Sequence, residues 1–298
     1  MNVLVISNVT KRFGEKEVLR GASFSVPEHS VFGFIGKNGA GKTTTMKIIL
    51  GLLKPERGDI YVAGEKVVYG QTSTNRNIGY LPDVPEFYSF MTPKEYLTFC
   101  GEIIGMPKEE IVGRVEQMLE LVGLSGERGR IKGFSRGMKQ RLGIAQALLN
   151  RPKLLICDEP TSALDPVGRK EILDILVRAK EQTTVLFSTH ILSDIERICT
   201  DVAFLNEGEI VISGTLDEIH SMYSTEEYVI EVVKACDAKK ILKTFCDLDS
   251  INSTKVLVKN ERALYPLLKW IAIEEIEIVR IEKLEPTLES LFLEVVKS

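Results

Sequence analysis

Short runs rich in apolar residues alternate with helical periodicity over about the first 220 residues. Ser30–Ile35, Lys153–Cys157 and Thr183–Ser188 are the clearest of these runs. Runs of this kind are typical of parallel strands that helices cover on both faces. In Lys42–Leu53, apolar residues recur at the spacing of an amphipathic helix. The pattern therefore predicts an α/β fold.

The stretch Asp83–Lys132 has helical periodicity and little strand signal. Thr92-Pro93-Lys94-Glu95 is a strong helix start, because a Thr cap is followed by Pro and then by Glu three residues after the cap. A second helix is predicted over Lys108–Val122, ending at Gly123. We therefore expect a helical insertion over about residues 84–150.

The C-terminal part predicts a separate small domain. Asp201–Ser213 reads as a hairpin, and Thr215–Glu218 has the form of a capping box that opens a helix. The polar stretch Ser224–Glu226 is the candidate boundary, which gives domains at 1–222 and 226–298. The second domain is predicted as a small α+β unit, with strands at about 228–233, 255–258 and 276–281 and helices at 238–245, 262–271 and 286–296.

Composition narrows the class of protein. The chain has 298 residues, 44% of them apolar, which is enough for one large domain or two unequal ones. Its 38 basic and 42 acidic residues give a net charge of −4, so no general polycationic surface for nucleic acid is expected. The five cysteines are scattered without a CxxC, which fits a reducing compartment. No apolar run approaches the roughly 20 residues that cross a bilayer, so we expect any membrane role to depend on a partner.

Gly36–Thr43 matches the pattern GxxxxGK[ST] in full, after an apolar strand and before a helix. Glycines allow backbone N–H groups to turn toward phosphate oxygens, and the helix N-terminus adds partial positive charge. Lys42 can neutralise the β- and γ-phosphates, and the Thr43 hydroxyl can bind Mg²⁺. The alternative is an ordinary glycine-rich turn, which the strand and helix on either side disfavour. The motif alone indicates a nucleoside triphosphate without naming the reaction.

Two acidic residues, Asp158 and Glu159, directly follow the apolar run 153–157. Asp158 could hold Mg²⁺, and Glu159 could accept a proton from an attacking water. Adjacent acids at a strand end are otherwise a common turn signal. Cys157 lies inside the apolar run, and we expect it to be a packed core residue.

A third motif, Phe134–Gln140, opens a helix with Ser135 as its N-cap, which is either a second anion site or a plain capped helix. This motif precedes the acid pair Asp158-Glu159 in the chain. The segment Pro160–Asp165 follows the pair directly, and His190 follows the next apolar run. With these motifs in this order, residues 1–220 closely resemble the nucleotide-binding subunit of an ATP-binding-cassette (ABC) transporter. The expected fold is then a P-loop ATP-binding cassette with a mixed sheet core.

The resemblance assigns roles to single residues. Glu159 would be the catalytic base of ATP hydrolysis, His190 the switch histidine at the γ-phosphate, and Ser162–Asp165 the loop after the catalytic acid. Mg²⁺ would lie at Thr43, Asp158 and Asp83. Phe13, expected ahead of the first strand, matches the aromatic that stacks on adenine, though as a residue it could equally be a core aromatic. The implied ATP-binding residues are Phe13, Gly36, Asn38, Gly39, Ala40, Gly41, Lys42, Thr43, Thr44, Ser135 and Gly137.

Two departures from the family pattern stand out. The family signature usually reads LSGGQ, and here Arg136 replaces its first Gly and Met138 its Gln. Most cassettes carry Gln where Asp83 stands, and a carboxylate cannot donate a hydrogen bond as an amide can. The residues after it, Val84–Met91, would lie near a transmembrane partner.

The resemblance also implies partners. One chain carries one phosphate loop and one signature, so two cassettes, as a homodimer or heterodimer, would close head-to-tail around two ATP molecules. The segment Glu285–Leu293 resembles the tail of subunits from drug- and bacteriocin-export systems. The expected protein is thus the ATPase subunit of an exporter whose integral membrane permease is a separate chain. It would be cytoplasmic, peripheral on the cytoplasmic face of the membrane, with no nucleic-acid partner.

Two other functions stay open at this point. A soluble cassette ATPase acting on ribosomes or nucleic acid is the main alternative. Translation factors of this family normally carry two cassettes per chain, and chromosome-maintenance members carry a long coiled coil, whereas the stretch between Lys42 and Asp158 has no heptads. The other alternative is a P-loop kinase, a function in which Phe134–Gln140 and His190 would have no role.

Overall fold

The computed structural model describes residues 1–71, 73–222, 226–284 and 287–291, and it divides into two units, Met1–Leu216 and Asp217–Ser298. The first unit holds the motifs of the sequence. The boundary expected at Ser224–Glu226 falls almost wholly on residues outside the described ranges.

A six-stranded mixed sheet forms the centre of the first unit. In spatial order its strands are β10 (Glu209–Thr215), β9 (Asp201–Asn206), β3 (Val31–Ile35), β8 (Thr184–Thr189), β7 (Leu154–Asp158) and β6 (Ile78–Leu81). All neighbours pair in parallel except β9 and β10, which form the predicted hairpin. Strands β3, β7 and β8 are buried along their whole length, as their continuous apolar runs predict.

The parallel register brings the carboxyl ends of four strands to one edge of this sheet. Ile35 lies opposite Thr189, Ser188 opposite Asp158, and Cys157 opposite Leu81. The chain segments that leave these strands therefore start side by side. Those segments carry the phosphate loop, His190, Glu159 and Asp83, which the sequence alone could not bring together.

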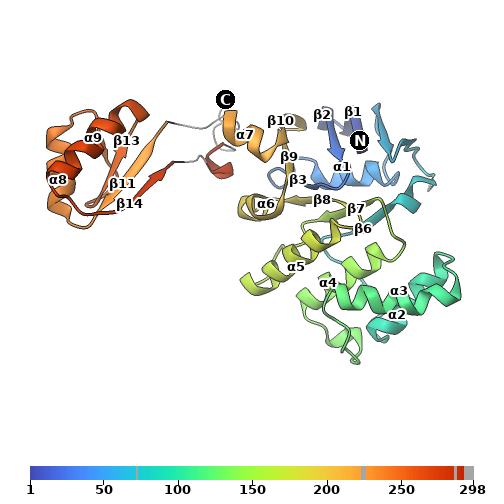
Figure 1. Ribbon diagram of the computed structural model, residues 1–298. Coiled ribbons are helices and arrows are strands. Elements are labelled where there is room, and N and C mark those ends of the chain that lie inside the picture. Colours follow the sequence, from blue (N-terminus) through green and yellow to red (C-terminus); the bar gives the residue numbers. More distant parts are fainter. Residues whose placement is uncertain (72, 223–225, 285–286, 292–298) are drawn as a thin grey trace. The chain divides into compact units, whose positions relative to one another are not determined.

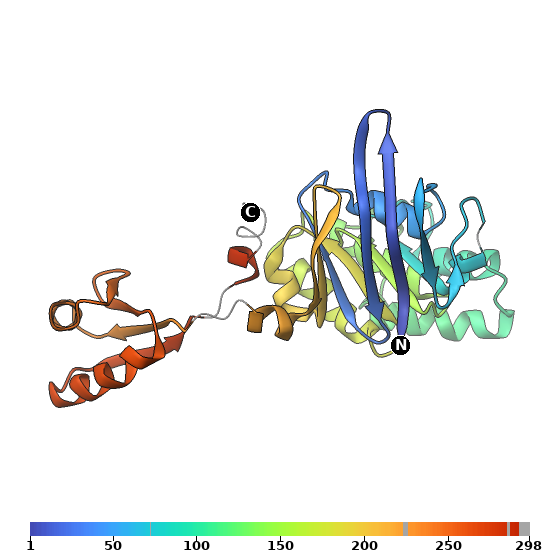
Figure 2. The ribbon, with the colours of Figure 1, turned by 90° about the horizontal axis from the view of Figure 1, so that it is seen from above.

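A second, antiparallel sheet was not predicted. It contains, in spatial order, β2 (Lys16–Pro27), β1 (Asn2–Phe13), β4 (Arg57–Val62) and β5 (Glu65–Lys66), and Figure 2 shows the long β1–β2 hairpin from above. Register shifts interrupt the pairing of β1 with β2. These bulges break the strict alternation of buried and exposed residues, so the sequence signal for the strands is weak.

One buried cluster joins the two sheets through α1 (Lys42–Ile49). Phe24 of the antiparallel sheet stacks on Phe32 and Phe34 of β3, with ring centroids 5.6 and 5.1 Å apart. Met46 of α1 belongs to the same cluster and is fully buried. Helix α1, predicted to extend to Leu53, is shorter because Leu50 is its C-cap and Gly51 follows with a positive φ of 68°.

The predicted helical insertion lies between β6 and β7 (Figure 1). It contains α2 (Pro93–Ile103), α3 (Lys108–Leu121), a short 3-10 helix at Ile131–Gly133 and α4 (Arg136–Leu148). A further 3-10 helix at Ser73–Asn77 precedes β6 and lies outside the insertion. The capping box of Thr92 and Glu95 is confirmed. After β7 come α5 (Pro166–Ala179) and α6 (Leu192–Ile198), and α7 (Leu216–Met222) begins at the last residue of the first unit.

The second unit has its own hydrophobic core and a four-stranded antiparallel sheet. The elements are β11 (Tyr228–Val232), α8 (Ala235–Thr244), β12 (Asp249–Ser250), β13 (Lys255–Val258), α9 (Glu261–Ile273) and β14 (Ile278–Lys283). The short β12 was not predicted, and β14 starts two residues later than expected. The last predicted helix is described only at residues 288–291, and the rest of it lies outside the described ranges.

Candidate functional site

The phosphate loop occupies residues 36–41, between β3 and α1. Gly41 is the N-cap of α1 and has a φ of 114°, which a residue with a side chain rarely adopts. A Cβ atom on Gly36 would lie 2.6 Å from the carbonyl oxygen of Leu205, so this position has no room for a side chain. The loop thus places the N-terminus of α1 at the carboxyl end of the parallel strands. The N-terminus of a helix attracts anions, so this arrangement can bind phosphate.

Lys42 begins α1, and only 6% of its side chain is exposed. Its Nζ atom donates a hydrogen bond of 2.6 Å to the carbonyl oxygen of Gly36 and lies 3.1 Å from Oε1 of Glu159. The lysine charge is therefore held inside the curve of the loop, where the phosphates of a nucleotide would require it.

Asp158 ends β7 and is 4% exposed. Its two carboxylate oxygens accept hydrogen bonds from the hydroxyls of Thr43 (2.8 Å) and Ser188 (2.6 Å). These bonds fix the orientation of the carboxylate beside the phosphate loop.

Glu159 follows directly and has a positive φ of 48°, which turns the chain sharply after the strand. Its backbone N–H donates to the carbonyl oxygen of Ser188 at 3.1 Å. Its carboxylate lies between two partners, because Oε2 is 2.9 Å from Nδ1 of His190 while Oε1 faces Lys42. The structure thus brings together the predicted catalytic base, the predicted switch histidine and the lysine of the phosphate loop.

A cleft of about 620 Å³ opens over Lys42, Asp158 and Glu159, whereas His190 is not among the residues that line it. Ten predicted site residues line it: Phe13, Asn38, Gly39, Gly41, Lys42, Thr43, Thr44, Asp83, Asp158 and Glu159. Lys16, Val18 and Lys37 line it as well and were not predicted. Lys37 stands inside the phosphate-loop motif and could have been included, whereas nothing in the spacing of Lys16 and Val18 indicates their role.

The position of Phe13 corrects one expectation. It is the last residue of β1 rather than a residue ahead of the first strand, and half of it is exposed. A core role is thereby excluded, since core aromatics are buried. Its ring lies at the rim of the cleft, where Lys11 places its Nζ atom 5.2 Å from the ring centroid.

Ser135 and Gly137 do not line this cleft. They lie at the start of α4, where the Ser135 hydroxyl accepts a hydrogen bond from the backbone N–H of Met138 at 3.2 Å, as predicted for an N-cap. Within one chain, the signature segment and the phosphate loop therefore form two separate surfaces.

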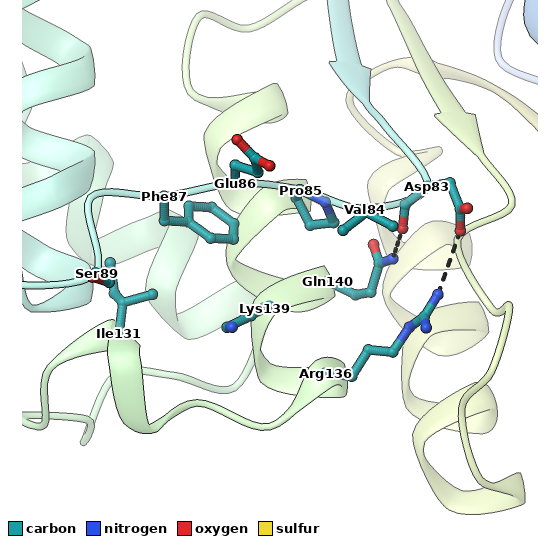
Figure 3. Close-up of a pocket in the computed structure, with 10 residues that line it drawn as sticks. All are labelled: Asp83, Val84, Pro85, Glu86, Phe87, Ser89, Ile131, Arg136, Lys139 and Gln140. Carbon is teal, nitrogen blue, oxygen red and sulfur yellow. Dashed lines mark hydrogen bonds and ion pairs between the residues drawn. The ribbon is translucent and has the colours of Figure 1, made fainter.

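A neighbouring groove of about 430 Å³ shares Asp83 with the cleft. Figure 3 shows its lining, which comprises Asp83, Val84, Pro85, Glu86, Phe87, Ser89, Ile131, Arg136, Lys139 and Gln140. The side chain of Gln140 is fully buried and donates a hydrogen bond of 2.6 Å to the carbonyl oxygen of Asp83. The groove thus lies where the segment after β6 crosses the start of α4.

The oxygen atoms in the cleft fit Mg²⁺. Among the described residues, no group of three or more His, Cys, Asp or Glu side chains could hold a metal ion by itself. Mg²⁺ does not need such a group, because it binds to one or two carboxylates and completes its coordination with phosphate oxygens and water. The hydroxyl of Thr43 and the carboxylate of Asp158, with Asp83 nearby in the lining, supply oxygen donors of this kind.

The acids also affect a neighbouring tyrosine. The pKa of Tyr80 in β6 is raised to about 12, chiefly by burial and next by the charge of Asp158, with smaller effects from Cys157 and Asp83. Burial likewise raises the pKa of the Cys157 thiol, which is fully buried, in agreement with its predicted core role. The charge of Asp158 thus acts on a residue of the neighbouring strand as well as on the cleft.

Comparison with known proteins adds four similarities. The family model for the ABC transporter matches residues 19–162. The ABC transporter ATP-binding protein YxlF of Bacillus subtilis (strain 168) is 45% identical over 231 residues, 77% of each chain. The bacitracin transport ATP-binding protein BcrA of Bacillus licheniformis is 41% identical over 220 residues, 73% of this chain and 71% of BcrA. A solved ATP-binding subunit of an ABC transporter superposes with a TM-score of 0.67 at 33% identity, over 74% of this chain and 93% of that one.

Proposed function

The chain belongs to the ABC transporter family of ATP-binding proteins, and we propose that it hydrolyses ATP as one half of a cassette dimer that drives a separate membrane permease. Hydrolysis of ATP is the activity of this family. The dimer, the permease and the direction of transport are the proposed part. The observation that carries the proposal is the position of the Glu159 carboxylate, which lines the cleft over the phosphate loop and contacts both Lys42 and His190.

In this proposal, ATP binds with its phosphates on the loop and its base near Phe13. Lys42 and the N–H groups at the start of α1 neutralise the phosphate oxygens. Glu159 accepts the proton of the attacking water, and His190 orients the Glu159 carboxylate from its other side. Mg²⁺, held by Thr43 and Asp158 with Asp83 nearby, would stabilise the charge on the leaving phosphate. The roles of Glu159 and His190, and the joint role of Thr43 and Asp158, use contacts that already exist between these side chains.

The separation of the two predicted phosphate-binding surfaces supports a dimer. Ser135 and Gly137 lie outside the cleft that contains Lys42. A capped helix N-terminus of this kind attracts anions. We infer that it binds the γ-phosphate of ATP held by a second cassette, so that two chains, identical or related, enclose two nucleotides and exclude water from them.

A membrane partner is proposed for the helical insertion. Among the described residues, no helix is both long enough and apolar enough to span a membrane. Beside the groove, the apolar side chains of Val84, Tyr88 and Phe90 are more than half exposed. Exposed aromatic side chains that gather at a groove are typical of a protein interface. We propose that a cytoplasmic segment of the permease binds there, which would place the chain on the cytoplasmic face of the membrane.

The similarity to BcrA supports a drug or peptide exporter as the complete assembly. Two experiments test the proposal.

The first experiment is an ATPase assay, in which the purified chain should release phosphate from ATP in the presence of Mg²⁺. Replacement of Lys42 by Ala should abolish nucleotide binding, whereas replacement of the exposed Lys94 should not. The chain should also purify from detergent-solubilised membranes together with a polytopic membrane protein encoded in the adjacent reading frame. A chain that hydrolyses ATP but binds no membrane protein contradicts the transporter role and leaves the ATPase intact.

A further inference from the structure

The two residues at which the sequence departs from its family pattern, Asp83 and Arg136, meet in the fold. Nη2 of Arg136 lies 3.5 Å from Oδ1 of Asp83, and Figure 3 shows the two side chains reaching toward each other across the end of the groove. Asp83 comes from the segment after β6, and Arg136 is the first residue of α4. The contact therefore joins the edge of the ATP cleft to the helical insertion.

Asp83 needs a cation because of where it lies. Three carboxylates line the cleft, and two of them are well supplied with partners. Asp158 accepts two hydroxyl hydrogen bonds, and Glu159 lies between Lys42 and His190. Among the described residues, Arg136 is the cation that pairs with the third carboxylate. Without that pair, Asp83 would present a full negative charge to the triphosphate, which repels it.

Helix α4 holds Asp83 at two points. Gln140, one helical turn after Arg136, bonds the Asp83 carbonyl oxygen at 2.6 Å, while Arg136 contacts its side chain. Arg136 is also 3.5 Å from the hydroxyl of Ser162, whose backbone N–H donates to the carbonyl oxygen of Glu159 at 3.0 Å. Arg136 thus lies between two segments that border the cleft, and its position follows that of α4.

We propose that Arg136 is a positioning residue that neutralises Asp83, so that the affinity of the cleft for ATP depends on the contact between α4 and the segment after β6. The inference rests on the proposed binding of ATP in this cleft. Both side chains are nearly half exposed, so the pair is weak and can break. Because Arg136 also lines the groove, a ligand that engages it there changes the affinity for ATP, and ATP changes the affinity of that ligand by the same factor.

The test is equilibrium binding of ATP in the absence of divalent metal, where no other added cation neutralises Asp83. Arg136→Gln should raise the Kd by about two- to fivefold, which is the range for an exposed ion pair. Arg136→Lys, which keeps the charge, should bind ATP like the wild type. The double variant Asp83→Asn with Arg136→Gln should regain the affinity of Asp83→Asn alone. Because exposed charges are screened by salt, the differences should shrink at high ionic strength.

Lys94→Gln is the matched control, because it breaks an exposed ion pair of the helical insertion, that of Lys94 with Glu116 at 2.9 Å, away from both the cleft and the groove. It should leave the Kd unchanged. The proposal is overturned if Lys94→Gln weakens binding as much as Arg136→Gln does, or if the double variant keeps the full loss of Arg136→Gln. A wild-type chain that binds no ATP would overturn the proposed function itself, and this inference with it. Circular dichroism of each variant establishes that the losses do not come from unfolding.

Discussion

Nζ of Lys42 lies 3.1 Å from Oε1 of Glu159, and both side chains are largely buried, with 6% and 14% of their surfaces exposed. The lysine that would bind phosphate and the acid that would activate water thus share one short contact at the floor of the cleft. A buried ion pair is held most firmly when its remaining hydrogen-bonding capacity is used, and here Gly36 and His190 supply the other partners. The contact places the proposed base beside the lysine that would bind the terminal phosphate.

Glu159→Gln should therefore keep ATP binding and lose turnover. The amide preserves the shape of the side chain but cannot accept a proton from water, and general-base catalysis contributes about 10²- to 10⁴-fold to a rate. Phosphate release should fall by about that factor, and ATP-dependent dimers should accumulate in size-exclusion chromatography. Glu181→Gln, an exposed position outside the cleft, is the control and should behave like the wild type. Hydrolysis by Glu159→Gln at the wild-type rate would rule out Glu159 as the base.

Gly79→Ala should destabilise the cassette, whereas Gly113→Ala should stabilise it. A Cβ atom on Gly79 in β6 would collide with the carbonyl oxygen of Ala147 in α4, and a forced overpacking costs about 1–3 kcal/mol. Gly113 lies in the exposed middle of α3, and the space that an added methyl group would fill there is open. At such a position Ala is favoured over Gly by about 0.5–1 kcal/mol.

Urea unfolding followed by circular dichroism measures both glycine variants. Fluorescence is less suitable, because the single tryptophan, Trp270, lies in the second unit. Equal midpoints for the two variants would show that β6 and α4 are not in the close contact described.

Asp194→Ala should cost about 2–4 kcal/mol of the free energy of unfolding. Asp194 is 3% exposed and accepts hydrogen bonds from the hydroxyl of Thr161 at 2.8 Å and from Arg169 at 2.6 Å. Its loss leaves a buried hydroxyl and a partly buried guanidinium without their acceptor. In the exposed pair of Asp174 and Arg197, 3.5 Å apart, Asp174→Ala should cost less than about 1 kcal/mol. Similar losses from the two variants in denaturant titrations would contradict the role of burial.

The capping box of α2 should make stability depend on acid pH. The carboxylate of Glu95 accepts a hydrogen bond from the backbone N–H of Thr92, and this bond lowers the pKa of Glu95. A pKa that folding lowers contributes stability above the unfolded-state pKa, and the contribution is lost as the pH falls through the folded-state pKa. The wild type should therefore be more stable than Glu95→Gln near neutral pH, and the two should converge in thermal melts as the pH drops below about 4. A difference that stays constant over that range contradicts the assignment.

Much of the fold follows from local patterns, and the failures have local causes. The three continuous apolar runs were correctly predicted as strands. Helices cover such strands on both faces, so every position is apolar and the prediction does not depend on the pairing register. The β1–β2 hairpin was missed because its bulges disturb the period of two. The end of α1 was misplaced by the apolar residues Leu50 and Leu53, which continue the helical spacing past the positive φ of Gly51.

The order and type of residues by themselves determined the phosphate loop, the acid pair, the capped signature helix and the histidine after the next strand, since each depends only on neighbours in the chain. Only the tertiary structure decided that Thr43 bonds Asp158, that Glu159 lies between Lys42 and His190, and that Asp83 pairs with Arg136. The physical reason is that periodicity specifies which residues are buried, whereas the lateral order of the strands specifies which buried segments end side by side. That order, β3–β8–β7–β6, comes from packing across the whole unit.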